Sequence, residues 1–213
     1  MQIPDKKRVT IVGCGPGDKS YITQIGIDKI TKSEILIGSK RLLEIFPDVS
    51  AKQILLGRDY NDFAENIKKL TLEYNKVVVL VSGDPGFFSL AKILTKKLGI
   101  NNCNVIPGIS SVQLAFARIG ESWSDAQFMS LHGRDGELER LTQTIKENKK
   151  VAVLTDDINN PARIADALQQ NNITNRTAYV FENLSAHNES IQEFSIRSLC
   201  KADINGMNIV IFM

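Results

Sequence analysis

Three short segments of this sequence combine glycine with small polar residues, and each directly follows an apolar run. They are GCGPGD at residues 13–18, SGDPG at 82–86 and PGISS at 107–111. Glycine lets a backbone approach a ligand closely, and Asp84, Ser110 and Ser111 carry side chains that could hydrogen-bond to it. The segments therefore predict a ligand cradle. A fourth loop of this kind is the turn at residues 154–156 in the second half of the chain. The alternative is that all four are ordinary strand-to-helix turns, in which Asp84, Ser110 and Asp156 only cap helices.

The first segment lacks the features of the common phosphate-binding loops. A dinucleotide fingerprint has a third glycine where Asp18 stands, and a P-loop needs a Gly-Lys-Ser/Thr sequence. We therefore disfavour a nucleotide pyrophosphate site and expect Asp18 to act as a cap. Cys14 lies between loop glycines, and a small buried thiol explains it better than catalysis does.

The sequence contains no recognisable protein nucleophile or metal motif. There is no Ser-His-Asp or Cys-His signature, no HExxH and no DxDxG loop, and the only histidines are His132 and His187. We therefore expect a reaction that needs neither a protein nucleophile nor a metal. Methyl transfer from S-adenosylmethionine fits this expectation, because the sulfonium is already activated and the protein chiefly aligns donor and acceptor.

Apolar runs alternate with helical patterns through the first 120 residues. The buried run VVVLV at 77–81 ends at the second glycine segment, and the pattern of residues 87–98 predicts a helix immediately after it. Further strands are expected at 9–12, 35–37, 53–56 and 104–106, and further helices at 21–33, 41–46, 59–74 and 112–120. This alternation predicts a parallel sheet with right-handed crossovers. In such sheets ligands bind beyond the carboxyl ends of the strands, where all three glycine segments lie.

The pattern loosens after Gly120, where a polar stretch surrounds Trp123. We place a domain boundary there, which gives an N-terminal domain of residues 1–120 and a C-terminal domain of residues 121–213. Strands are expected at 127–131, 151–154, 176–181, 190–194 and 207–212, and helices at 137–148 and 161–170, with Pro161 in a first turn. Because the last strands have no long helices between them, the fold class is α/β with a mostly parallel N-terminal sheet and a mixed C-terminal sheet.

Composition narrows the class of protein. The 213 residues carry a net charge of +2, with 43% hydrophobic and 23% charged residues, as in ordinary globular proteins. This charge balance argues against a general nucleic-acid binder. Cys14, Cys103 and Cys200 form no CxxC pair, so neither a zinc site nor a secreted disulfide framework is indicated. The apolar runs are too short to cross a bilayer, so we expect a cytoplasmic protein without membrane contacts.

The order and spacing of GxGPG, SGDPG and PGxSS resemble the tetrapyrrole methylases, a two-domain α/β family that binds S-adenosylmethionine in the cleft between its domains. A closer match is carried by ILIGSKRL at 35–42, ARIG at 117–120, SLHGR at 130–134, LTD at 154–156 with Pro161, and Glu182 with Leu184. These residues resemble the methylases that act at C5 of precorrin-7 or cobalt-precorrin-7 in cobalamin synthesis. The resemblance implies that activity. A methylase for another macrocycle carbon or a non-tetrapyrrole acceptor, and a non-catalytic corrinoid-binding module, remain alternatives.

By position, the resemblance implies which residues border S-adenosylmethionine. They are Gly13, Gly15, Pro16, Gly83, Asp84, Phe87, Ser110, Ser111, Leu154 and Thr155. No metal is implied. The family tends to have glycine where this chain has Ser185, which leaves the conformation of the 185–189 loop open. The resemblance also implies a homodimer. Because the C5-methyltransferase can be fused to a decarboxylating C15-methyltransferase, and this chain stops after its final strand, we expect a separate protein to supply that step.

A corrinoid precursor carries several carboxylates, so cations at loop tips would suit it, and the planar fork of arginine can bind a carboxylate bidentately. The candidates for substrate binding are Lys40, Arg41, His132 and Arg134. Arg58 and Arg118 are expected to be ordinary surface charges, and His187 to face solvent. His132 is the histidine we consider for any proton transfer.

Overall fold

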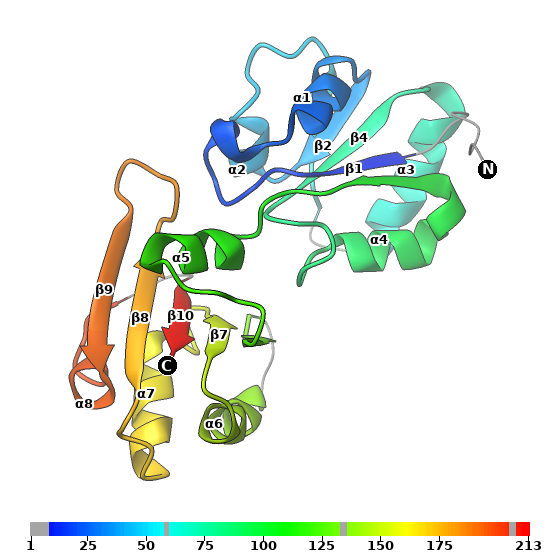
Figure 1. The fold of residues 1–213 in the computed structure, drawn as a ribbon. Helices are drawn as coiled ribbons and strands as arrows, with labels where there is room; N and C mark the ends of the chain where they lie inside the picture. Colours follow the sequence, from blue (N-terminus) through cyan, green and yellow to red (C-terminus); the bar gives the residue numbers. More distant parts are fainter. Residues whose placement is uncertain (1–8, 58–59, 133–135, 205–207) are drawn as a thin grey trace. The chain divides into compact units, whose positions relative to one another are not determined.

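The computed structural model describes residues 9–57, 60–132, 136–204 and 208–213 (Figure 1). It divides into two compact units, Met1–Ser110 and Ser111–Met213. The boundary expected at Gly120 thus differs from the division at Ser110, and helix α5 (Ser111–Ile119) is part of the second unit. The reason is packing: α5 buries its apolar face, including Leu114 and Phe116, and contacts strand β10 of that unit.

The first unit contains a five-stranded sheet in the order β3-β2-β4-β1-β5, and all of its strand pairs are parallel. Its strands are β1 (Val9–Gly13), β2 (Ile35–Gly38), β3 (Lys52–Leu55), β4 (Val77–Val81) and β5 (Cys103–Ile106). Its helices are α1 (Gln24–Thr31), α2 (Lys40–Leu43), α3 (Tyr60–Glu73) and α4 (Ala91–Leu98), with 3-10 turns η1 (Lys19–Tyr21) and η2 (Ile100–Asn102). The predicted parallel sheet is confirmed.

The order of the strands follows from one reversal of the chain. From β1 to β3 the chain moves toward one edge of the sheet, with α1 and α2 on one face; it then returns through β4 to β5, with α3 and α4 on the other face (Figure 1). Right-handed crossovers require this change of face when the direction reverses. The reversal makes β4, β1 and β5 neighbours, so the loops that follow these three strands emerge side by side.

Strand β4 spans the five predicted residues, but the helix after it begins later than predicted. Helix α4 starts at Ala91, whereas the apolar pattern placed the start at residue 87. Phe88 has a φ of 45°, which a right-handed helix does not accommodate, and the Ala91 amide donates to the Ser89 hydroxyl at 3.3 Å. The expected cap at Asp18 is present, because its carboxylate accepts from the Ser20 amide at the start of η1.

The second unit contains a mixed sheet, as predicted, in the order β6-β7-β10-β8-β9. Its strands are β6 (Gln127–Ser130), β7 (Val151–Leu154), β8 (Thr177–Glu182), β9 (Ser190–Ser195) and β10 (Ile209–Phe212). Only the β6–β7 pair is parallel among the described strand pairs of this sheet. Helices α6 (Glu137–Glu147), α7 (Pro161–Gln170) and α8 (Ile196–Leu199) share one apolar core with the sheet. Pro161 opens α7 as expected, and residue 207, where the last strand was expected to begin, lies outside the described residues.

No helix in the described ranges has both the length and the apolar character that crossing a membrane requires.

Candidate functional site

The loops after β1 and β4 are joined by backbone hydrogen bonds at the carboxyl edge of the first sheet. The Gly83 amide donates to the Gly15 carbonyl at 2.8 Å, and the Gly15 amide donates back to the Gly83 carbonyl at 3.3 Å. The Cys14 amide also donates to the Val81 carbonyl at 2.8 Å. The bond of Cys14 extends the parallel pairing of β1 with β4, and the separate antiparallel bridge between Gly15 and Gly83 then joins the two glycine segments.

The loop after β5 packs directly on these two segments. A Cβ atom added at Gly13 would lie 2.6 Å from the Gly83 oxygen and 2.8 Å from the Gly108 nitrogen. A Cβ atom added at Gly108 would overlap the same Gly83 oxygen and lie 2.8 Å from the Gly13 carbonyl carbon. Glycine is needed at both positions because three backbones meet there. The structure therefore brings the three glycine segments together, as the sequence predicts for a cradle.

Asp84 holds the second and third loops in place. Its Oδ1 accepts a hydrogen bond from the Gly86 amide at 2.7 Å, and its Oδ2 accepts one from the Gly108 amide at 3.1 Å. The alternative that Asp84 only caps a helix is wrong, because the N-cap residue of α4 is Leu90. Asp84 thus organises the cradle from within, and a role of its carboxylate toward a ligand stays a prediction.

The remaining candidates near the glycine loops are Pro16, Phe87 and Ser110 of the first unit and Ser111, the first residue of the second unit. Ser110 is buried, and its Cα lies 3.7 Å from the position that a Cβ on Gly83 would occupy. Ser111 begins α5, and Pro16 lies in the first loop and is partly exposed. Phe87 packs edge-on against Phe88, with 4.7 Å between ring centroids. Of these residues Ser110 is buried, Pro16, Phe87 and Ser111 are partly buried, and Phe88 is exposed.

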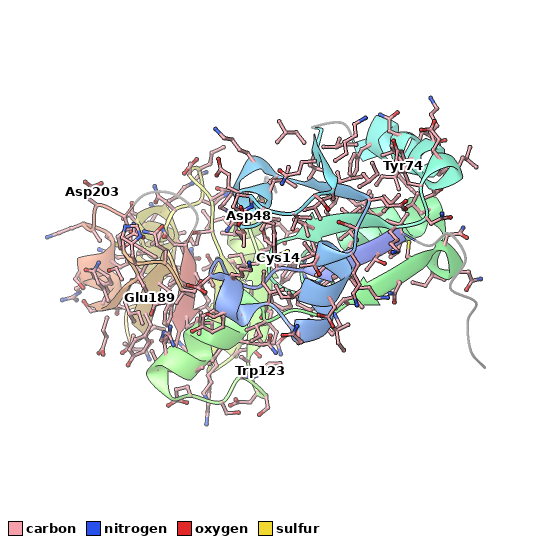
Figure 2. The ribbon with its side chains drawn as sticks, turned by 90° about the horizontal axis from the view of Figure 1, so that it is seen from above. Cys14, Asp48, Tyr74, Trp123, Glu189 and Asp203 are labelled. Carbon is pink, nitrogen blue, oxygen red and sulfur yellow. The ribbon has the colours of Figure 1, made fainter. Side chains whose placement is uncertain are left out.

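Cys14, labelled in Figure 2, is fully buried between the loop glycines. Burial raises the pKa of its thiol to about 12, with smaller opposing effects from a backbone hydrogen bond to Val81 and from the charge of Arg41. A thiol with this pKa stays protonated near neutral pH and is a poor nucleophile. The structure agrees with the expectation that Cys14 is a packing residue.

Arg41 and Lys40 are neighbours in sequence but face different surroundings. The Arg41 guanidinium donates from Nη2 to the Ser82 hydroxyl at 2.8 Å, which places it beside the second glycine loop. Lys40 instead lies 3.9 Å from Glu44 and is highly exposed. The sequence interpretation named Arg41 as a candidate and included Ser82 in the second glycine segment, but gave Ser82 no role. The one feature of the sequence that could have pointed to Ser82 was its position as a polar residue directly after the buried strand β4.

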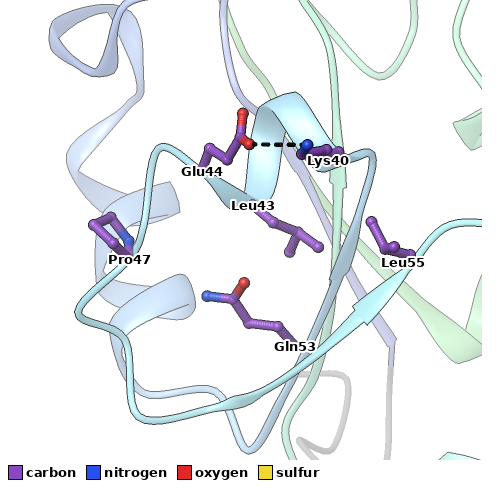
Figure 3. Close-up of a pocket in the computed structure, with 6 residues that line it drawn as sticks. All are labelled: Lys40, Leu43, Glu44, Pro47, Gln53 and Leu55. Carbon is purple, nitrogen blue, oxygen red and sulfur yellow. Dashed lines mark ion pairs between the residues drawn. The ribbon is translucent and has the colours of Figure 1, made fainter.

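Lys40 lines a concavity beside α2, which Figure 3 shows in close-up. Its volume is about 470 Å³, and it is formed by residues from α2, from β3 and from the connection between them. They are Lys40, Leu43, Glu44, Pro47, Gln53 and Leu55. None of the glycine-loop residues lines it, so Lys40 belongs to this concavity and Arg41 to the loops.

The second unit holds the remaining candidates at the carboxyl ends of its parallel pair, β6 and β7. His132 is exposed just beyond β6, and the amide of the intervening Leu131 donates to the Leu154 carbonyl at 2.9 Å. The Thr155 side chain is buried, and its hydroxyl exchanges hydrogen bonds with the Asn208 backbone, each 3.0 Å long. This hydroxyl therefore fastens β10 to the end of β7. Arg58 and Arg134 lie outside the described residues.

The loop after β8, in the second unit, is held by an ion pair and a backbone hydrogen bond. Arg118 on α5 donates from Nε to Glu189 at 2.6 Å and from Nη2 at 3.2 Å, and Glu189 also accepts from the Ser185 amide at 2.6 Å. Arg118 is thus an ion-pair partner, rather than the solitary surface charge that we expected. Ser185 has a φ of 68°, the left-handed conformation that favours glycine, so the loop keeps this backbone shape without a glycine there.

The alternative that Asp156 caps a helix is wrong, because its carboxylate instead closes the turn that precedes α7. Its Oδ1 accepts from the Ile158 amide at 3.0 Å and from the Asn159 amide at 2.6 Å. Asn160, four residues further on, is the N-cap of α7. His187, as expected, is exposed.

Comparisons with known proteins agree with this arrangement. The chain is 33% identical over 208 residues to the probable cobalt-precorrin-7 C(5)-methyltransferase of Methanocaldococcus jannaschii, which covers 96% of this chain and 97% of the relative. It is 32% identical over 206 residues to the cobalt-precorrin-7 C(5)-methyltransferase of Salmonella typhimurium, with 96% and 98% covered. A decarboxylating precorrin-6Y C(5,15)-methyltransferase of a Sinorhizobium species matches at 26% identity, but over only 44% of that longer protein.

Solved structures share the fold. The precorrin-6Y methylase of cobalamin biosynthesis from Archaeoglobus fulgidus superposes with a TM-score of 0.74 at 24% identity, covering 97% of each chain. A uroporphyrin-III C-methyl transferase from Thermus thermophilus, solved with S-adenosylhomocysteine, gives a TM-score of 0.79 at 17% identity, covering 96% of each chain. The family of tetrapyrrole (corrin/porphyrin) methylases matches residues 8–200. With this match over most of its length and two relatives above 30% identity, the chain belongs to the tetrapyrrole methylases.

Proposed function

We propose that this protein is an S-adenosylmethionine-dependent methyltransferase that methylates C5 of cobalt-precorrin-7, or of its cobalt-free counterpart, in cobalamin synthesis. The observation that carries the proposal is the similarity to two cobalt-precorrin-7 C(5)-methyltransferases over nearly the whole length of both partners. The junction of the three glycine loops supports it, because a family member needs a compact site for its cofactor on that edge of the sheet.

The residues present at this junction fit S-adenosylmethionine. Where Gly13, Gly83 and Gly108 meet, the backbones pack directly on one another, with Pro85 against Gly13 and Ser110 beside Gly83. Backbone amide and carbonyl groups in such loops can bind the polar groups of a nucleoside and of an amino acid. We propose that the cofactor is bordered by Gly13, Gly15, Pro16, Gly83, Asp84, Phe87, Ser110 and Ser111 of these loops, and by Leu154 and Thr155.

The cofactor supplies an activated methyl group on its sulfonium. The work left to this chain is therefore to bind and orient two reactants and to exclude water, which by itself can account for a large rate acceleration. The neutral thiol of Cys14 fits this division of labour, because it does not compete as a methyl acceptor.

The acceptor carries several carboxylates, and we propose that Lys40, Arg41, His132 and Arg134 bind them. Arg41 is the best placed of these, since its guanidinium lies against the second glycine loop. Any proton that leaves C5 is proposed to pass to His132, which is exposed and so accessible to a substrate.

The physiological setting of the enzyme is also a proposal. We propose a cytoplasmic homodimer that works beside a separate protein for decarboxylation and C15 methylation. The two relatives that this chain matches over 97% and 98% of their length are named for C5 methylation, which supports this division.

The test is methyl transfer with S-adenosylmethionine that carries a 13C-labelled methyl group, using cobalt-precorrin-7 as acceptor. We expect one labelled methyl per macrocycle, and NMR correlation of that methyl with C5. Methylation at another ring carbon would overturn the C5 assignment. Binding of the macrocycle without transfer would favour a corrinoid-binding module instead.

A further inference from the structure

Arg41 is held at the glycine loops by a residue that is distant in sequence. Arg41 lies in α2, directly after the Gly38 end of β2, whereas Ser82 is the first residue after β4. Because β2 and β4 are neighbours in the sheet, the side chains at their carboxyl ends meet, and Nη2 of Arg41 donates to Oγ of Ser82 at 2.8 Å. The next residue, Gly83, is part of the three-loop junction.

The charge of Arg41 has no carboxylate partner among the described residues. Arg118, in contrast, is paired with Glu189 and Arg140 with Glu137. Its partner Ser82 is a neutral hydroxyl. Arg41 also acts on the junction itself, because its charge lowers the pKa of the Cys14 thiol slightly against the larger effect of burial. An uncompensated cation thus faces the loops.

We propose that Ser82 is a positioning residue that holds the Arg41 guanidinium at the glycine loops, where Arg41 binds a carboxylate of one of the two reactants. One N–H group of the guanidinium is fixed by Ser82. Since the guanidinium is planar and rigid, its other N–H groups then point in set directions and can engage a carboxylate through two parallel bonds. This inference rests on the proposed function and deepens it by naming the group that Arg41 recognises.

The carboxylate has two possible sources: the amino-acid part of S-adenosylmethionine, or an acid side chain of the macrocycle. Two calorimetric titrations and one kinetic measurement separate them. The titrations use S-adenosylhomocysteine, which carries the amino-acid carboxylate, and methylthioadenosine, which lacks it. The kinetic measurement is the KM for cobalt-precorrin-7, which reports a change in binding of the macrocycle. The variants are Arg41→Ala, Arg41→Lys, Ser82→Ala and Ser82→Thr. Arg197→Ala, an exposed arginine on α8, is the control for loss of charge.

If the cofactor is the source, Arg41→Ala weakens binding of S-adenosylhomocysteine roughly tenfold and leaves methylthioadenosine unchanged. If the macrocycle is the source, both affinities stay unchanged, while the KM for the acceptor rises roughly tenfold with little change in kcat. Arg41→Lys keeps the charge but loses the fork, so it recovers only part of either loss.

If Ser82 positions Arg41, then variants of Ser82 should affect the same measurements as Arg41→Ala. Ser82→Ala should produce a roughly threefold loss of the same kind as Arg41→Ala, and Ser82→Thr should restore it because the hydroxyl is retained. In the Arg41→Ala background, Ser82→Ala should add nothing, since the two residues act through one contact.

Unchanged affinities and an unchanged KM in Arg41→Ala would overturn the proposal. Equal loss of S-adenosylhomocysteine and methylthioadenosine would also overturn it, because that pattern indicates a disordered loop rather than a lost carboxylate contact. A wild-type protein that binds S-adenosylhomocysteine but does not methylate cobalt-precorrin-7 would refute the proposed acceptor. The two nucleoside titrations alone would then decide the role of Arg41.

Discussion

The junction of the glycine loops predicts a large effect from one added methyl group. In Gly108→Ala this methyl would overlap the Gly83 carbonyl oxygen and lie 2.8 Å from the Gly13 carbonyl carbon. Both neighbours are backbone atoms and cannot rotate away, so one loop must shift. Overpacking of this kind costs about 1–3 kcal/mol. The shift also weakens the bond from the Gly108 amide to Asp84, and a bond to a charged group contributes roughly 1.5–3 kcal/mol.

We therefore expect Gly108→Ala to lower the free energy of unfolding by about 3 kcal/mol, which for a chain of this size lowers the thermal midpoint by roughly 6–12 °C. Circular dichroism melts of the wild type and the variant measure this shift. Gly57→Ala is the matched control, because the added methyl there has no described atom within 4 Å apart from its chain neighbours, and its midpoint should stay close to that of the wild type. Equal midpoints for Gly108→Ala and Gly57→Ala would refute the backbone contact between the loops.

Three further predictions concern the second unit. Thr155→Val removes the hydroxyl that bonds both backbone groups of Asn208, so it should destabilise the fold by about 1–3 kcal/mol in urea titrations. Thr142→Val, which loses only a bond to the preceding helical turn, should cost less. Ser185→Val should lower the thermal midpoint by the equivalent of about 1–2 kcal/mol, because a φ of 68° opposes a branched side chain. Ser185→Gly should not lower it, because this φ suits glycine, and equal midpoints of the two variants would argue against this backbone shape. The Arg118 hydrogen bond lowers the pKa of Glu189, so the stability that this residue contributes is present above its unfolded pKa of about 4.3 and is lost as the pH falls through the lower folded value. Urea midpoints of Glu189→Gln and the wild type should thus differ at pH 7 and converge once the pH falls below the lowered folded pKa of Glu189. A gap that widens in acid would contradict this sign.

The elements of the fold were predictable where one local pattern decides them. Strand β4 is a run of five apolar residues that ends at glycine, and its bounds match the prediction. The start of α4 was not predictable in the same way. Phe87 and Phe88 continue the apolar pattern of the helix, but the left-handed φ of Phe88 is set by the preceding turn, and residue type alone does not reveal it.

The site was predictable as a set of loops, but not in its contacts. The glycine segments identified the positions where backbones meet, because few other residues fit there. Asp84 accepts a hydrogen bond from the Gly108 amide, and Arg41 donates one to the Ser82 hydroxyl. In both pairs the two residues are far apart in the sequence. Only the strand order brings these partners together, and a single sequence specifies that order weakly. The resemblance implied Thr155 as a cofactor neighbour, which stays a prediction, but the hydrogen bond of its hydroxyl to the Asn208 backbone could not be read from the sequence.

The most direct test of the account is hydrogen–deuterium exchange of the wild-type protein, read by mass spectrometry with and without saturating S-adenosylhomocysteine. If the junction of the glycine loops is the cofactor site, the ligand should slow amide exchange in peptides that cover residues 13–17, 82–86 and 107–111. Peptides from α8 should exchange at the same rate with and without it. Binding that protects other segments and leaves these three loops unchanged would contradict the central claim.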